Sequence, residues 1–155
     1  NKGSSSGSGA VAVTDNGDQT VTIPAYNLTI TKCRAGTSGQ YCETGSPTYA
    51  FCNAADNSCN GGTDSGSLDG GGTSAAYTVF DGLVLGGHSD WRLPMLDEAK
   101  KLTAVSFANL LVVSPGGYTS RSASATHAFF FTTAGGSGNI SVSTKTVANN
   151  VYCVR

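Results

Sequence analysis

The chain has 155 residues, of which only 12% are charged, and its formal net charge is −1. Soluble domains usually carry about a quarter charged residues, so this balance excludes the basic surface that binds nucleic acid or anionic membranes. Gly, Ser and Thr account for 58 residues, which favours short strands joined by turns. With an apolar fraction of 39%, the composition predicts one folded, secreted, β-rich domain and not a disordered chain.

Residues 1–9, "NKGSSSGSG", form a low-complexity arm that precedes a single domain spanning 10–155. Ordering such a tail costs about 1 to 2 kcal/mol per residue. An ordered arm would therefore be held by an adjacent copy of the protein, in a homo-oligomer. The following "AVAV", residues 10–13, alternates small and branched residues, as a strand inserted in a neighbour's groove would.

Residues 11–23 predict a β-hairpin, because apolar residues alternate with small or polar ones on both sides of the turn sequence "DNGD". Residues 28–31 continue the alternation after Pro24 and predict a third strand. Residues 33–73 lack alternation and predict a long loop, of the kind that is usually functional or stapled.

The segment 73–85 predicts a short helix that is capped by Thr73 or Ser74 and ended by Gly82 or Gly86. Its apolar residues recur at helical spacing. The expected buried face consists of Ala76, Val79, Phe80 and Leu83.

A second helix is predicted near 95–104 by the segment "PMLDEAKKL". Pro94 suits its first turn, and Met95, Ala99 and Leu102 fall on one stripe that we expect to be buried. The acidic residues precede the lysines, as the helix dipole prefers.

Three strands are predicted in the last part of the chain, at 127–133, 139–143 and 150–155. We expect the strands near 11–31 and 127–154 to share sheets that the two helices cover. The predicted class is α+β. No run of about 18 apolar residues occurs, so we expect no insertion into a membrane.

The five cysteines predict a disulfide framework in an oxidising compartment. No CxxC pair is present, so the ligand spacing of a structural zinc site is absent. Several pairings are open. We favour Cys33–Cys42 and Cys52–Cys59, because each bond closes a short loop rich in turn residues, and Cys153 is then a free or interchain thiol.

The cluster His88-Ser89-Asp90 fails as a hydrolytic triad, because three consecutive side chains cannot place a base between a nucleophile and an orienting acid. No residue type ties His127 to a nucleophile, and nucleotide-binding glycine motifs are missing. We therefore expect no enzyme and no cofactor. Nor do we expect a calcium site, because the loop aspartates lack EF-hand spacing. These aspartates are Asp56, Asp64 and Asp69.

Trp91, Arg92 and Pro94 are interpreted as structural anchors at the entrance to the second helix. Trp91 offers a large apolar body with one N–H donor, and the Arg92 guanidinium can tie together loop carbonyls or carboxylates. A ligand-binding Trp-Arg pair is the alternative. No other ligand-binding residue can be named from the sequence.

Several segments occur in a familiar order: "TDNGDQTVTI", "DGLVLGGHSDWRLPMLDEAKKL", "GGYTSRS", "HAFFFTTAGGSGNISVSTKT" and "NVYCVR". This order resembles the bacterial Lcl C-terminal domain family, and "CNAADNSCNGGTDSG" is similar to a cysteine-stapled variant in spirochaete surface families. The resemblance spans about 14–155. It implies a C-type-lectin-like fold with long stapled loops, export to the cell surface, and adhesion or ligand display without catalysis.

Three positions depart from the pattern of that family. A Thr cap is usual where Met95 stands, a Trp where Thr119 stands, and often a Cys where Phe80 stands. The resemblance thus implies that Cys153 has lost its partner. The calcium-ligating tripeptides of sugar-binding C-type lectins are absent, so that route to sugar binding does not carry over.

Two functions follow as expectations. The first is an extracellular adhesin or ligand-binding domain whose partner is a host or matrix glycan or protein. The alternative is a structural subunit of an extracellular filament or sheath, whose partner is the protein itself, assembled through the arm 1–9 and the unpaired Cys153.

Overall fold

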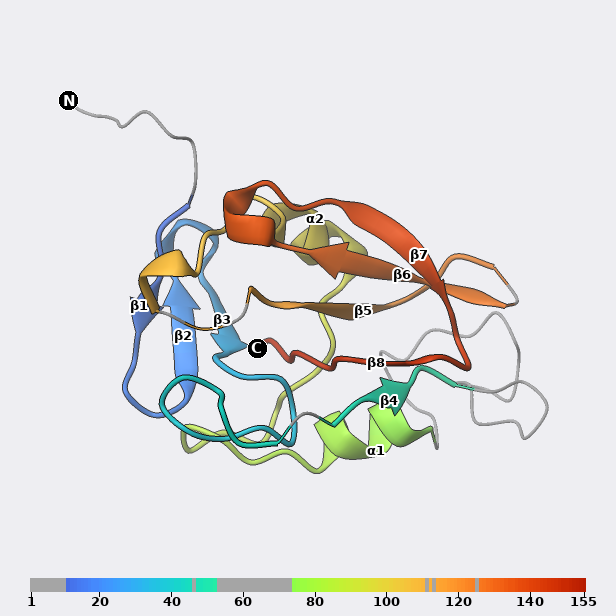
Figure 1. Cartoon of the computed structure of the whole chain (residues 1–155), viewed down its shortest axis with the longest axis horizontal. Helices are drawn as coiled ribbons and strands as arrows, with labels where there is room; N and C mark the ends of the chain where they lie inside the picture. Colours follow the sequence, from blue (N-terminus) through green and yellow to red (C-terminus); the bar gives the residue numbers. More distant parts are fainter. Residues whose placement is uncertain (1–10, 46, 53–73, 111, 113, 125) are drawn as a thin grey trace.

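The computed structural model has an α+β architecture with antiparallel sheets, in agreement with the predicted class (Figure 1). It describes residues 11–45, 47–52, 74–110, 112, 114–124 and 126–155. The predictions on the arm 1–9, Thr73, Cys59 and the three loop aspartates fall outside these ranges.

The first sheet contains the predicted hairpin and third strand, in the order β1-β2-β3. Its strands are β1 (Thr14–Asp15), β2 (Thr20–Ile23) and β3 (Leu28–Thr31), and the 3-10 turn η1 (Pro24–Tyr26) joins the last two. Alternate residues of β2 and β3 are buried, namely Val21, Ile23, Leu28 and Ile30. The period-two pattern in the sequence therefore marks the face that packs into the core.

The second three-stranded sheet has the order β5-β6-β7 and lies in the upper half of Figure 1. Its strands are β5 (Gly116–Ser122), β6 (His127–Thr132) and β7 (Ile140–Thr144). A two-stranded sheet pairs β4 (Tyr49–Ala50) with β8 (Ala148–Asn149). The expectation that β6 and β7 share a sheet with β1 to β3 is wrong.

Strand β5 was not predicted, because it begins with two glycines and shows no alternation. A Cβ atom at Gly117 would lie 2.3 Å from the carbonyl oxygen of Asn150. Glycine is thus required where the C-terminal segment passes close to this strand.

The C-terminal segment 150–155 runs through the middle of the molecule (Figure 1). Its predicted strand is not formed as such, and single bridges join Val154 to Ile30 on one side and to Arg92 on the other. Residues 151–154 are all buried. The segment still hydrogen-bonds on both sides, because its backbone exchanges bonds with Thr29 of β3 through Arg155 and with Arg92 through Val154.

Helix α1 (Ala75–Asp81) is capped as predicted, since the Ser74 side chain accepts a hydrogen bond from Tyr77 N–H, and it ends at Gly82. Its buried residues are Ala76 and Phe80. Two residues of the predicted buried face, Ala76 and Phe80, are therefore buried as expected, whereas Leu83 lies beyond the end of the helix.

Helix α2 (Leu96–Leu102) buries Ala99 and Leu102 as predicted, but Met95 is 47% exposed. Met95 is the N-cap and has an extended backbone, which removes it from the helical spacing. Pro94 likewise precedes the helix and does not lie in its first turn. Both corrections have one cause: the helix starts a residue later than the apolar pattern implied.

Residues 11–13 bind their own chain. Val11 forms a parallel bridge with Val105, with hydrogen bonds from Val11 N–H to Ala104 O (3.0 Å) and from Ser106 N–H to Val11 O (3.2 Å). Val13 is buried in the same core cluster as Val105. The expectation that "AVAV" inserts into a neighbouring copy is therefore corrected for these residues.

Candidate functional site

The segment 85–92 forms a tight turn that seats Trp91. Leu85 and His88 exchange backbone hydrogen bonds of 2.9 and 3.0 Å across Gly86 and Gly87, which both have positive φ, as a two-residue hairpin turn requires. Trp91 is 3% exposed, and its indole N–H is shared between the carbonyls of Leu85 and His88, each at 3.2 Å.

His88, Ser89 and Asp90 are exposed on this turn. The Asp90 carboxylate accepts a hydrogen bond of 2.7 Å from Arg155, and this bond lowers the pKa of Asp90. Within the described part of the chain, the ring nitrogens of His127 contact two hydroxyls, that of Thr126 at 2.7 Å and that of Thr144 at 3.5 Å. The Asp90 contact thus joins the turn to the C-terminal Arg155, and the His127 contacts are with the preceding residue and with β7.

Arg92 and Pro94 connect the start of α2 to its surroundings. The Arg92 guanidinium donates two hydrogen bonds to Glu98, at 2.6 and 2.8 Å, and the Glu98 carboxylate also accepts from Met95 N–H at 2.9 Å. The Pro94 carbonyl accepts from Ser120 N–H at 2.9 Å. Burial by itself raises the pKa of Glu98, but the hydrogen bonds from Arg92 and Met95 outweigh it, and the pKa is lowered.

Among the described cysteines, Cys33, Cys42 and Cys52 are disulfide-bonded and Cys153 is a buried thiol. Cys33 and Cys42 form the favoured disulfide, which closes a surface loop. The favoured Cys52–Cys59 pair includes a residue outside the described ranges, and Cys52 itself is buried. Cys153 is a free thiol with no exposed surface, and burial raises its pKa to about 12. A buried thiol of this kind does not suit an interchain bond.

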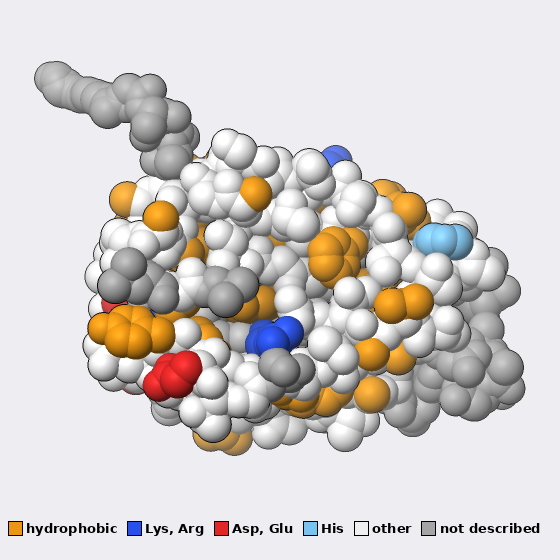
Figure 2. Space-filling view, in the orientation of Figure 1, with side chains coloured by type: hydrophobic (Ala, Val, Ile, Leu, Met, Phe, Trp, Pro, Cys, Tyr) orange, Lys and Arg blue, Asp and Glu red, His pale blue; other side chains and the backbone are white. Residues whose placement is uncertain are grey.

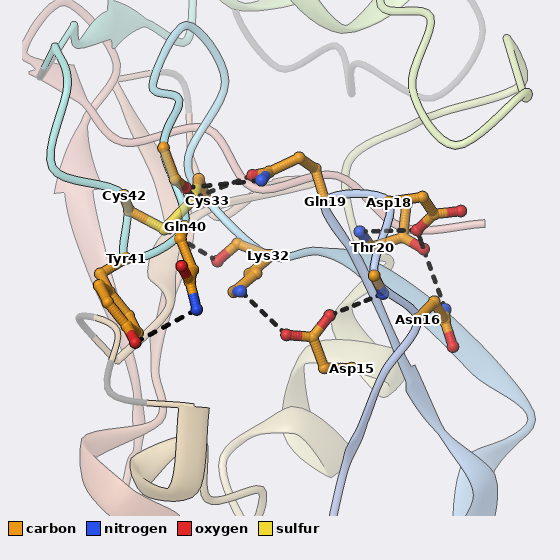
Figure 3. A network of polar contacts seen from close by, with 12 residues as sticks. Asp15, Asn16, Asp18, Gln19, Thr20, Lys32, Cys33, Gln40, Tyr41 and Cys42 are labelled. Atoms are coloured by element: carbon orange, nitrogen blue, oxygen red, sulfur yellow. Dashed lines mark hydrogen bonds and ion pairs between the residues drawn. A yellow bond between two sulfur atoms is a disulfide. The ribbon is translucent and has the colours of Figure 1, made fainter.

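A hollow with a volume of about 350 Å³ lies beside the disulfide (Figure 3). Three segments line it: the β1–β2 hairpin, the residue that follows β3, and the loop closed by the disulfide (Figure 3). The lining residues are Asp15, Gly17, Gln19, Lys32, Gly39 and Gln40. Two neighbouring hollows of about 110 and 70 Å³ fall below the range of roughly 300 to 1,000 Å³ that holds small ligands.

An ion pair crosses the wall of this hollow. The Lys32 ammonium lies 2.9 Å from Asp15 Oδ2, and their side chains are 7% and 32% exposed. The other carboxylate oxygen accepts from Gly17 N–H at 2.9 Å. The hydrogen bonds from Lys32 and Gly17 lower the pKa of Asp15, so this carboxyl group is ionised at neutral pH.

The hairpin turn aims Gln19 at the disulfide loop. Gln19 has φ of 71°, a left-handed conformation that costs energy in a non-glycine residue. Its carbonyl accepts from Lys32 N–H at 2.9 Å, which fixes the turn against the residue after β3. The side-chain amide then lies over the loop, 3.5 Å from Gly39 O (Figure 3).

Sequence reasoning missed this hollow, because its residues come from three separate places in the chain. Each is unremarkable alone: a polar turn, a lysine after a strand, and a Gly-Gln pair in a loop. One signal was available, since Gln19 and Gln40 are the only glutamines in the chain and both line the hollow.

The described residues contain no group of three or more His, Cys, Asp or Glu side chains that could hold a metal ion. Within the same part of the chain, no helix is long and apolar enough to cross a membrane. The face shown in Figure 2 carries few charged side chains, and uncharged polar groups and backbone make up most of it.

Comparison of the chain with family models, curated proteins and solved structures finds no significant match. The site therefore has to be interpreted from its own chemistry.

Proposed function

We propose that this chain is a non-enzymatic extracellular surface domain that binds a ligand and serves in adhesion. The observation that carries the proposal is the polar hollow of about 350 Å³, whose wall contains a nearly buried ammonium and whose rim is fixed by a disulfide. Binding sites typically combine such a concavity with a few well-placed polar groups on a rigid support.

Two further features support the extracellular setting. A disulfide is compatible with an oxidising compartment, and the weakly charged, hydroxyl-rich composition is typical of exported domains. We extend the proposal to membership of the Lcl C-terminal domain family and to a C-type-lectin-like arrangement, on the strength of the sequence resemblance. The α+β class and the antiparallel sheets are in keeping with it.

The test is binding of the purified chain to arrays of immobilised glycans and of extracellular-matrix proteins. The hollow is altered by the near-isosteric double substitution Asp15→Asn with Lys32→Gln, which removes both charges together. The control is Asp90→Asn, which breaks an exposed ion pair with Arg155. We expect the unaltered chain to bind at least one glycan or matrix protein in a saturable manner, and we expect the Asp90→Asn control to retain this binding. Absence of binding to every glycan and matrix protein would refute the proposal.

The alternative, a filament subunit assembled through its N-terminal arm, has lost part of its basis because Val11 and Val13 pack in their own chain. Its test is the particle mass in light scattering, with and without residues 1–10. A large assembly that dissociates on deletion would favour the filament, and a monomer in both cases would remove it.

A further inference from the structure

We infer that the hollow between the β1–β2 hairpin and the disulfide loop binds a neutral saccharide. This inference rests on the proposed ligand-binding function and names both its site and its ligand class. The site comprises Asp15, Gln19, Lys32 and Gln40, flanked by Tyr41 (Figure 3).

The charges in the hollow favour a neutral ligand. Asp15 and Lys32 form one ion pair at 2.9 Å, so their charges cancel. An anion that accepted a hydrogen bond from Lys32 would lie beside the negative Asp15 carboxylate, and a divalent cation that bound Asp15 would lie beside the positive ammonium. Each ion would therefore be repelled by one member of the pair. A neutral molecule avoids both costs.

The hydrogen-bonding groups of the hollow match hydroxyls, which both donate and accept. Among the described residues, the Lys32 ammonium makes one hydrogen bond with its three hydrogens, and its side chain is only 7% exposed. Asp15 keeps acceptor capacity on both carboxylate oxygens. A sugar hydroxyl placed between the two groups would accept from one and donate to the other.

The two glutamine amides extend this pattern across the hollow. Gln19 Oε1 lies 3.5 Å from Cys33 Sγ, which has no hydrogen to donate in a disulfide, so this oxygen remains an available acceptor. The Gln19 amide makes only a long contact of 3.5 Å with Gly39 O. A side-chain amide both donates and accepts hydrogen bonds, so each glutamine can bond to a hydroxyl in either sense.

Tyr41 supplies an exposed aromatic ring next to Gln40, one of the residues that line the hollow. It is 47% exposed, and its hydroxyl accepts a hydrogen bond of 3.2 Å from Gln40 Nε2 (Figure 3). Its backbone N–H donates to Glu43 Oε2 at 2.9 Å. An exposed ring that is fixed at both ends can cover the C–H face of a sugar ring, which no hydrogen-bonding group satisfies.

The site is held in shape before a ligand arrives. The disulfide fixes the loop that supplies Gly39 and Gln40, and the Lys32 N–H bond to Gln19 O fixes the hairpin. The strained φ of Gln19 is maintained by these contacts. Rigid groups lose little conformational entropy on binding, so a small neutral ligand suffices to occupy the site.

The experiment is an NMR titration of the ¹⁵N-labelled chain that follows side-chain amide signals. The chain contains only two glutamines, so each probe can be assigned with one variant, Gln40→Ala or Gln19→Asn. Asn is chosen at 19 because it tolerates a positive φ. The ligands are the methyl glycosides of glucose, galactose, mannose and N-acetylglucosamine, with sodium sulfate and triglycine as comparison ligands.

We expect at least one glycoside to shift both glutamine signals in a saturable manner. Gln40→Ala should weaken its binding about five- to tenfold, the value of one hydrogen bond to a ligand, and Tyr41→Ala should weaken it similarly. Tyr41→Phe should retain binding, because its hydroxyl faces Gln40. Asn139→Ala, an exposed amide just before β7, is the matched control and should bind normally. Mass analysis of the disulfide and thermal unfolding verify the fold of each variant.

The inference is overturned if sulfate or triglycine shifts these signals and no glycoside does, or if glycoside binding is unchanged in folded Gln40→Ala and Tyr41→Ala chains. Failure here differs from failure of the proposed function. A chain that binds an array ligand equally well with an altered hollow remains an adhesin but binds elsewhere, whereas a chain that binds nothing loses both proposals.

Discussion

Removing the Cys33–Cys42 disulfide should destabilise the chain by an amount that its loop length sets. The perturbation is Cys33→Ala with Cys42→Ser, since Cys33 is buried and Cys42 is partly exposed. The bonded residues are nine apart in sequence. In the chain-entropy model, a bond that closes a loop of that length lowers the entropy of the unfolded state. The folded state is thereby stabilised by about 2.6 kcal/mol at 25 °C.

The assay is equilibrium unfolding in urea, monitored by the fluorescence of the single Trp91. We expect the free energy of unfolding to fall by about 2 to 3 kcal/mol, together with a larger m-value, because the unfolded chain without the bond exposes more surface. Asp90→Asn, which breaks a surface ion pair, is the control and should change stability by less than about 1 kcal/mol.

A loss below about 1 kcal/mol with an unchanged m-value would refute the entropic argument. It would mean that the loop is held by its other contacts, such as the paired backbone hydrogen bonds between Ser38 and Thr44, at 3.0 and 3.1 Å. The same variant should also lose glycoside binding, since the bond positions Gln40 at the hollow.

Trp91→Ala should lower the free energy of unfolding by about 3 to 5 kcal/mol in a urea titration, because the ring is buried; a sub-kilocalorie loss would contradict its placement. Cys153 should resist iodoacetamide in the folded chain and react in urea, as peptide mapping would measure, because its pKa is raised to about 12; rapid native labelling would show the segment to be open. Stability should be level above about pH 5 and fall as the pH drops through the lowered pKa values of Asp15 and Glu98, since those carboxylates must be protonated on the acid side. Glu98→Gln should flatten that fall in an acid titration, and an unchanged profile would assign the acid sensitivity elsewhere.

The parts of the fold that the sequence predicted are those in which one local pattern determines the structure. The hairpin follows from alternation around "DNGD", and α2 follows from Ala99 and Leu102 with acids before lysines. Trp91 is buried, as expected for the one large apolar ring in a segment of mostly polar residues.

The parts that were missed depend on contacts between distant residues. The sequence of β5 does not indicate a strand. Its Gly117 is required because the backbone of Asn150, 33 residues away in the chain, passes close to it. Met95 fits the helical stripe in sequence, yet its N–H is satisfied by Glu98 and its side chain faces outward. The division into separate sheets likewise depends on where the C-terminal segment passes.

The hollow of the candidate site could not be predicted from the sequence for the same reason. Lys32 and Asp15 lie 17 residues apart and meet only because β1 and β3 flank β2 in one sheet. Gln40 joins them through the disulfide loop. Pairing the two cysteines was predictable from their spacing, but the spacing carries no information on which face of the loop meets the hairpin.

The fate of Cys153 connects the fold to the proposed family. The sequence resemblance implies a cysteine where Phe80 stands, bonded to the last segment of the chain. Phe80 and Cys153 lie in one buried cluster, together with Trp91 and Val151. Under the proposed family relationship, the phenyl ring at this position would take the place of a half-cystine, and apolar burial would replace a covalent constraint. Burying a Phe side chain contributes about 1.5 to 3 kcal/mol, comparable with one disulfide. The buried cluster thus holds the C-terminal segment at the centre of the fold by apolar packing, with the Cys153 thiol fully buried within it.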